Sequence, residues 1–257
     1  MNLINNSTNI ILRYILYLFP IFIIIGNAAT NSAAILVLLI YFIKCFVKKK
    51  ILFFETFEFK FFLYLYLYLL INSFFSDDIK SSLIRTIPYL KFFIFVLIYK
   101  NFIENKKIIL KNLGFFWFFI IILLSLDIIY QSIFGYNFFN FSNPDKTRNS
   151  GLFMDELVGG GFLLSFVFII YFLTIKKNHH IYFYLFFIFF LIVIFLTGER
   201  SNFLKFIFVL ICTFYFYSKS GLIFKVLSLC SLILLIVFLI SNISNIKYRY
   251  LSSITFS

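Results

Sequence analysis

The feature that most constrains this chain is a series of apolar runs, each long enough to cross a lipid bilayer. A spanning helix needs about 20 mainly apolar residues, and such runs recur throughout the 257 residues. Because lipid offers no partners for backbone N–H and C=O groups, each run is expected to be helical. The runs are continuous rather than alternating, which disfavours a β-barrel. The nine expected spans lie near 11–27, 31–47, 57–75, 84–99, 113–130, 159–175, 181–197, 203–217 and 223–241.

The predicted fold is therefore all-α, a polytopic transmembrane helical bundle forming a single domain over 1–257. Only a short polar segment separates the first two spans, so a single re-entrant hairpin is an alternative for that pair. The segment before residue 11 lacks the charged start and cleavage site of a signal peptide, and the first span is expected to stay as an anchor.

The composition excludes the other broad classes of protein. Hydrophobic residues make up 63% and charged residues 13% of the chain, against about 45–50% and 25% in soluble domains. The net charge of +13 does not indicate nucleic-acid binding, because the lysines are scattered in short loops between apolar runs. The excess of Phe, Ile and Lys is typical of an AT-rich genome, so the five arginines carry more information than the lysines.

The lysines predict the orientation. With a cytoplasmic N-terminus, 13 of the 18 lysines fall on the inner side, as the positive-inside rule requires. These are Lys44, Lys48, Lys49, Lys50, Lys60, Lys100, Lys106, Lys107, Lys111, Lys176, Lys177, Lys219 and Lys225.

The arginines follow the opposite pattern. Only Arg13 lies on the inner side, whereas Arg85, Arg148, Arg200 and Arg249 lie on the outer side. Outward arginines often pair with lipid phosphates or with nearby aspartates. The functional alternative is an outward site that binds an anionic substrate.

Arg148 belongs to the longest outer loop, 131–158, a length that is often functional. Gly151 allows a sharp turn close to it, and Asp155 or Glu156 would orient its guanidinium. The alternative is a surface loop whose charges pair with one another. Asp127, near the outer end of the fifth span, is an intramembrane acid and a candidate partner or base.

Arg200 lies in the segment TGERSNF between the seventh and eighth spans. Thr197 and Gly198 are expected to end one helix, and Ser201 to cap the next. Arg200 would then lie at the positive end of a helix dipole, with a fork of donors suited to phosphate oxygens. Glu199 would hold the guanidinium or act as a base. Such an arginine is also common as a simple topological stop.

A third basic segment carries Arg85 at the outer start of the fourth span and Lys91 about two turns deeper. Basic residues at membrane depth usually face a cavity or a partner, and here the partner would be Asp77 or Asp78. Arg85, Arg148 and Arg200 each precede or open an inward-running helix. The three could surround one anion-binding pocket, suited to a pyrophosphate attached to a lipid.

Other chemistries lack their motifs. His179 and His180 are the only histidines and lie in a cytoplasmic turn, and no metal-ligand spacing, phosphate-binding loop or dinucleotide fingerprint occurs. Cys45, Cys212 and Cys230 are expected to be inert apolar residues. No metal or cofactor is predicted, and the missing broken-helix repeats disfavour a transporter.

Four segments together resemble one family. LFPIFIIIGNAATNSAAILVLLIYFIK, SLIRTIPYLKFFIF, RNSGLFMDE and TGERSNFLKFIF are similar to motifs of the O-antigen ligase and O-antigen polymerase superfamily, in the same order and at similar separations. The resemblance covers most of the chain and rests on the combination, since each motif is short.

The resemblance implies a GT-C-like glycosyltransferase of lipopolysaccharide biosynthesis in the bacterial inner membrane. Such enzymes take a glycan from undecaprenyl pyrophosphate at the periplasmic face. Ligases transfer it to lipid A core, and polymerases to another lipid-linked unit. By this resemblance, Arg200 and Arg148 would be the catalytic arginines that bind pyrophosphate, while Arg85, Lys91, Glu199, Asp155 and Asp127 would bind substrate.

The chain departs from the family pattern at its end. Family members continue into a large periplasmic loop with a further arginine and, in ligases, a histidine that is thought to activate the acceptor. Residues 242–257 would be the start of that loop, so the chain is expected to be C-terminally truncated and to lack its catalytic base. A non-catalytic protein that binds or carries lipid-linked glycan is the alternative from another class.

Overall fold

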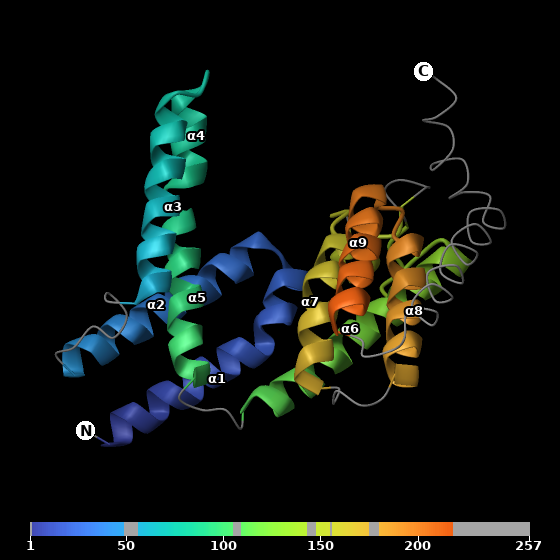
Figure 1. The fold of residues 1–257 in the computed structure, drawn as a ribbon, viewed down its shortest axis with the longest axis horizontal. Helices are drawn as coiled ribbons and strands as arrows, with labels where there is room; N and C mark the ends of the chain where they lie inside the picture. The colour runs from blue at the N-terminus through green and yellow to red at the C-terminus, as the bar shows by residue number, and fades with distance from the viewer. Residues whose placement is uncertain are drawn as a thin grey trace. The chain divides into compact units, whose positions relative to one another are not determined.

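The computed structural model describes residues 2–48, 56–104, 109–142, 148–154, 156–174 and 180–217 (Figure 1). Within these ranges the secondary structure is helical, apart from one isolated β-bridge between Tyr136 and Ser142. This agrees with the predicted all-α class. The elements are α1 (Asn2–Ile25), α2 (Asn27–Lys48), α3 (Phe57–Phe74), α4 (Ile79–Thr86), α5 (Tyr89–Glu104), α6 (Ile109–Phe134), the 3₁₀ turn η1 (Gly151–Phe153), α7 (Gly159–Thr174), α8 (His180–Leu196) and α9 (Arg200–Tyr217).

Local chemistry explains several helix boundaries. Gly26 separates α1 from α2 with a φ of +124°, a conformation that side chains disfavour. Thr56 caps α3 by accepting a hydrogen bond from the Phe59 N–H at 3.3 Å. Pro88, which lacks an N–H, lies between α4 and α5.

Five helical segments are long and apolar enough to cross a membrane: Thr8–Ile25, Asn27–Phe46, Phe57–Phe74, Ile79–Glu104 and Leu110–Phe134. They correspond to the first five predicted spans, and the first two form separate helices, each of spanning length. Gly159–Thr174 and Leu185–Leu196 are shorter apolar helices. The predicted span 223–241 lies outside the described residues, so the number nine stays a prediction.

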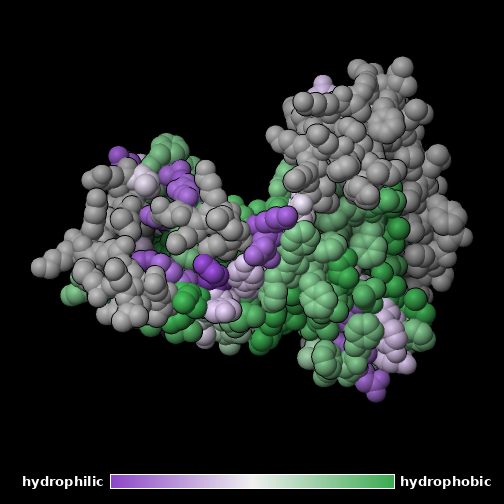
Figure 2. Space-filling view, turned by 90° about the horizontal axis from the view of Figure 1, so that it is seen from below, coloured by the Kyte–Doolittle hydropathy of each residue, from purple (hydrophilic) through white to green (hydrophobic). Residues whose placement is uncertain are grey.

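Figure 2 shows one face of the molecule, where hydrophobic residues cover much of the described surface. Many large apolar side chains are exposed, among them Phe46, Tyr64 and Phe75. Exposed apolar surface on this scale is compatible with contact with membrane lipid. The finding supports a membrane protein in contact with lipid.

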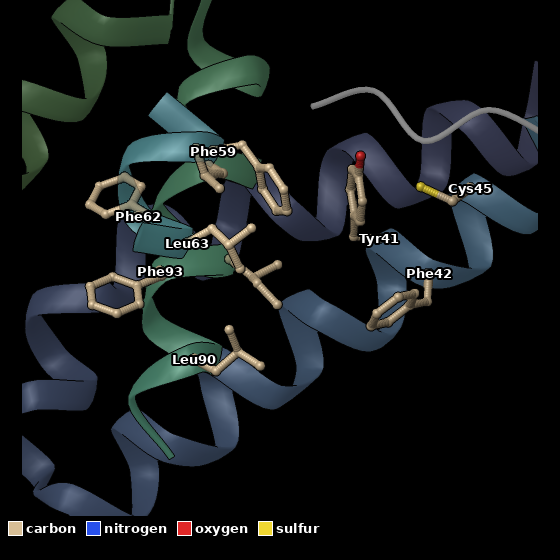
Figure 3. A pocket seen from close by; sticks show the side chains of 10 residues that line it. Tyr41, Phe42, Cys45, Phe59, Phe62, Leu63, Leu90 and Phe93 are labelled. Carbon is tan, nitrogen blue, oxygen red and sulfur yellow. The ribbon is translucent and has the colours of Figure 1, made fainter. Parts of the chain in front are cut away.

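The chain forms two compact units, Met1–Leu113 and Gly114–Ser257, here called unit 1 and unit 2. Both lie within the single predicted transmembrane domain. In unit 1, α1 packs on α2, and α5 contacts α2, α3 and α4. An apolar cavity lies between α2, α3 and α5 (Figure 3).

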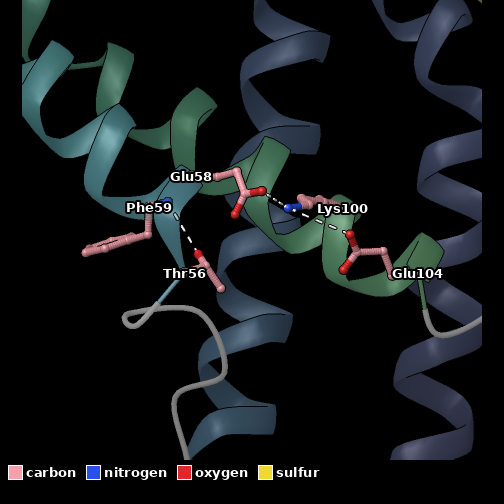
Figure 4. Close-up of polar contacts among 5 residues, drawn as sticks. All are labelled: Thr56, Glu58, Phe59, Lys100 and Glu104. Carbon is pink, nitrogen blue, oxygen red and sulfur yellow. Dashed lines mark hydrogen bonds and ion pairs between the residues drawn. The ribbon is translucent and has the colours of Figure 1, made fainter.

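Polar contacts between helices of unit 1 include an exposed ion-pair group (Figure 4). The Lys100 amino group on α5 pairs with Glu58 on α3, and lies 3.7 Å from the Glu104 carboxylate one turn along its own helix. All three side chains are well exposed, and such pairs contribute little to stability.

Unit 2 has the denser core. Its helices α7, α8 and α9 pack against one another, and the aromatic rings interlock. The ring of Phe168 lies 5.1 Å from that of Phe187 and 5.3 Å from that of Phe206. Phe187 and Phe206 are almost completely buried. Tilted aromatic pairs at such distances add to the burial of apolar area.

Candidate functional site

The loop after α6 is folded back onto the last turns of that helix. The Gly151 N–H donates to Gln131 Oε1 at 2.8 Å, and the Phe138 N–H donates to Asp127 Oδ1 at 2.7 Å. Gln131 was predicted to begin the loop, but α6 continues to Phe134. Both acceptors are therefore buried helix residues that bind loop backbone.

Asn137 fixes the middle of the same loop. Its amide Nδ2 donates to the Gly151 carbonyl at 3.0 Å. Its Oδ1 accepts from the N–H groups of Phe139 and Phe141, at 3.0 and 2.9 Å. Asn137 is 1% exposed, and its bond to the Gly151 carbonyl satisfies a buried backbone group.

Gly151 turns the loop backbone closely against α6. It has a φ of +58°, and a Cβ atom there would lie 2.8 Å from Ile128 Cγ1 and 3.2 Å from Leu124 Cδ1. Both the conformation and the space thus require glycine. The sequence prediction that Gly151 permits a sharp turn beside Arg148 is confirmed.

Asn149 joins the loop to the TGER segment. Its Nδ2 donates to the Leu196 carbonyl at 2.6 Å, and its backbone N–H donates to the Thr197 carbonyl at 3.3 Å. Arg148 precedes Asn149, and Arg200 follows Thr197 by three residues. The structure therefore brings two predicted basic sites, far apart in sequence, onto neighbouring stretches of backbone.

The TGER segment turns sharply at Gly198, which has a φ of +71°. α9 begins at Arg200, and the Phe203 N–H donates to the Glu199 carbonyl at 3.0 Å. Ser201 was predicted as the cap, which is wrong: it lies inside the helix, and Glu199 holds the position before the first helical residue. Arg200 is thus in the first turn, at the positive end of the dipole, as predicted.

The Glu199 carboxylate links α9 to α7. Its Oε1 accepts from the Gly160 N–H at 2.7 Å, and its Oε2 accepts a short hydrogen bond from the Asn202 amide. Glu199 is 8% exposed. Both oxygens are therefore occupied within the protein, and the geometry favours a structural cap for α7 over a general base.

The glycines at the start of α7 allow this close approach. A Cβ on Gly160 would lie 2.8 Å from Thr197 Oγ1 and 3.0 Å from Glu199 Cδ. On Gly161 it would lie 3.2 Å from Asn202 Nδ2. The N-terminus of α7 thus packs directly against the turn that carries Arg200.

Among the residues that the structure describes, several buried polar atoms of this region have no hydrogen-bond partner. They are Asp127 Oδ2, Gln131 Nε2, Ser150 Oγ and Arg148 Nε. A buried polar group without a partner costs free energy comparable to a lost hydrogen bond, and such groups concentrate at sites that bind something further. Arg148 as a whole is half-buried, and its Nε atom is buried.

The remaining candidates are not brought to this site by any described contact. Arg85, in the last turn of α4 and exposed, and Lys91, in the first turn of α5, belong to unit 1. The Lys91 amino group lies 5.1 Å from the centroid of the Phe92 ring. A pocket with three arginines stays a prediction, and Asp155 and Arg249 lie outside the described residues.

Gln131, Asn137 and Asn149 were missed as site residues. Only Asn149 carried a usable signal, since it directly follows Arg148 in the RNSG motif. Among the described residues, no group of three or more His, Cys, Asp or Glu side chains could hold a metal ion. Cys45 and Cys212 are free thiols.

No family model matches this chain, and no curated protein or solved structure is significantly similar to it.

Proposed function

We propose that unit 2 binds the pyrophosphate of a polyprenyl-linked glycan, and that the chain belongs to an O-antigen ligase-like glycosyltransferase of the bacterial inner membrane. In this proposal the fold is GT-C-like, with nine spans and a cytoplasmic N-terminus. The glycan moves from undecaprenyl pyrophosphate to lipid A core at the periplasmic face.

The observation that carries the proposal is the pair of hydrogen bonds from Asn149 to the backbone of Leu196 and Thr197. It places Arg148 and Arg200 on adjoining backbone beside the N-termini of α7 and α9. Two guanidinium groups next to two helix N-termini form a strongly positive region. Pyrophosphate is the kind of ligand that such a region binds most strongly.

In this proposal the site has one chemical task, which is to stabilise the leaving group. When the glycosyl–phosphate bond breaks, negative charge develops on the pyrophosphate leaving group. Arg148 and Arg200 would stabilise that charge through charge-assisted hydrogen bonds. The unpartnered Nε of Arg148 supplies a donor for this purpose. The lipid tail would remain in the bilayer beside the helices.

The other predicted residues take supporting roles in this proposal. Glu199 fixes the turn that carries Arg200, and Asp127 fixes the loop that carries Arg148. Arg85, Lys91 and Asp155 stay predicted contacts to the substrate.

The test is binding of radiolabelled undecaprenyl pyrophosphate to the purified full chain in detergent. Arg148→Ala and Arg200→Ala should each weaken binding by about 10- to 100-fold, since each removes hydrogen bonds between charged groups. Lys205→Ala is the control, because Lys205 is exposed on the same helix as Arg200. Wild-type chain that does not bind this lipid, or Arg variants that bind it normally, would overturn the proposal.

Turnover then separates the alternatives. Transfer of glycan to lipid A core in cells, lost in Arg200→Ala at normal expression, supports a ligase. Longer glycan chains on the lipid carrier support a polymerase of the same superfamily. Binding without either product supports a non-catalytic lipid-linked-glycan protein.

A further inference from the structure

The cavity of unit 1 is a second candidate binding site, independent of the site in unit 2. It has a volume of about 280 Å³ and is lined by residues of α2, α3 and α5 (Figure 3). Among the lining residues, only Tyr41 and Cys45 have a side-chain heteroatom. A cavity of this composition takes a hydrocarbon group rather than a polar ligand.

The rim of the cavity is exposed and its floor is buried. Phe42 and Leu63 at the rim are 55% and 39% exposed, whereas Tyr41 and Leu97 are 5% and 3% exposed. All three helices belong to candidate membrane spans, so exposed apolar side chains at this rim are expected to meet lipid. A hydrocarbon chain could therefore enter from the bilayer.

Two lysines neighbour lining residues in the last turn of α2 and the first turn of α3, and a third, Lys91, follows the lining residue Leu90 at the start of α5. Lys60 follows the lining residue Phe59 in the first turn of α3 and is exposed. Lys44 precedes the lining residue Cys45, and its amino group donates to Asn9 Oδ1 at 2.6 Å. The carboxylate nearest in sequence, Glu58, is paired with Lys100. Lysines at such a position extend to the headgroup layer and attract anionic lipids.

We propose that this cavity binds an anionic phospholipid, with one acyl chain between α2, α3 and α5 and the phosphate held by Lys60. The apolar lining sets the chemistry of the chain, and the lysine sets the preference for an anionic headgroup. The site lies on the side that the lysine distribution predicts to be cytoplasmic.

The test uses tryptophan fluorescence, because the chain has a single tryptophan. In a Trp117→Phe background, Phe59→Trp places a reporter in the cavity wall. The full chain in neutral detergent is titrated with phosphatidylglycerol or phosphatidylcholine brominated in the acyl chain, which quenches nearby tryptophan. Phe115→Trp in the same background is the control reporter, since Phe115 is 51% exposed on α6 and does not line the cavity.

Saturable quenching at position 59 is expected, with phosphatidylglycerol preferred by about fivefold. Lys60→Ala should remove this preference, and Lys80→Ala, which alters an exposed lysine of α4, should keep it. Cys45→Phe should abolish saturable quenching by filling the cavity, whereas Cys212→Phe, outside the cavity, should not. Far-UV circular dichroism verifies that each variant is folded.

Three results would overturn the proposal. They are equal binding of the two lipids, equal quenching at positions 59 and 115, and a preference for phosphatidylglycerol that survives Lys60→Ala. None of these three results depends on how well Cys45→Phe folds.

Discussion

The two units bury polar groups to very different extents. Of the nine buried polar residues described, eight lie in unit 2, and Ser73 is the exception in unit 1. Half of the residues are buried in the 18-residue apolar window of Leu110–Phe134, against 11% in Phe57–Phe74. Unit 1 is thus held mainly by apolar contact with exposed charges at its edges, whereas unit 2 holds a loop in place with buried hydrogen bonds. Precise positioning of side chains is the property that a binding site for a charged group needs.

The largest effect should come from Gly151 in unit 2. Gly151→Ala should lower the free energy of unfolding by about 3 kcal/mol, through left-handed strain and a clash with Ile128. Gly135→Ala is the matched control, because Gly135 has a φ of +82° but nothing within 4 Å of a Cβ. It should cost about 1–2 kcal/mol. Unfolding by SDS, followed by circular dichroism in detergent, measures both, and equal losses would mean that the packing around Gly151 is loose.

Asn149→Ala should cost about 2 kcal/mol, because it leaves the buried Leu196 carbonyl without its donor. It should also weaken binding of undecaprenyl pyrophosphate, since Arg148 loses its anchor. Asn72→Ala in unit 1 is the comparison: Asn72 is exposed on α3 and should change stability by less than about 0.5 kcal/mol. Equal losses of stability for the two substitutions in the same SDS titration would contradict the difference in buried hydrogen bonding between the units.

Glu199→Gln should cost about 1 kcal/mol, because the amide oxygen still accepts from the Gly160 N–H, while the charge and the hydrogen bond from the Asn202 amide are lost. Binding of the pyrophosphate lipid should be retained, and glycan transfer too where the chain supports it. Glu156→Gln, at an exposed position, should be neutral. Complete loss of transfer with normal folding and binding would instead identify Glu199 as a catalytic base.

The smallest effect is expected at Asp78, the N-cap of α4 in unit 1. The Ser81 hydroxyl and backbone N–H donate to this carboxylate, which lowers the pKa of Asp78 below its usual value. A lowered pKa contributes stability above the unfolded value of about 3.9, and that contribution is lost as the pH falls through the folded pKa. The protection factor of the Ser81 amide, which corrects its exchange rate for the intrinsic pH dependence, should therefore fall in acid. Asp78→Asn should abolish the pH dependence, and an unchanged profile would contradict the cap.

The first five spans could be predicted from the sequence because bilayer length and apolar composition are local properties. The exact residues at which the helices begin and end could be predicted less well. α6 extends to Phe134, and Gln131 in its last turns accepts from the Gly151 N–H, a long-range contact that hydropathy does not encode. Ser201 was taken for a cap on residue type alone, whereas Glu199 takes that position through its contact with Gly160.

The residues of the candidate site also divide into those that the sequence indicated and those that only the structure revealed. Arg148 and Arg200 stood out in sequence because arginine is rare here and both lie in short polar segments. The residues that join them did not stand out, since Asn149 and Asn137 are ordinary polar loop residues until their partners are known. Asp127 was noticed as an intramembrane acid, but its contact with the Phe138 N–H gives it a structural role that composition could not indicate.

By itself, the sequence determined that this chain is helical and suited to a membrane, because only internally hydrogen-bonded helices allow such apolar runs to leave water. Only the tertiary structure decided which polar segments meet. Asn149 finds the Leu196 carbonyl 47 residues away, and Glu199 reaches Gly160 across 39 residues. Such contacts depend on how helices and loops pack around buried backbone groups, which no local pattern specifies.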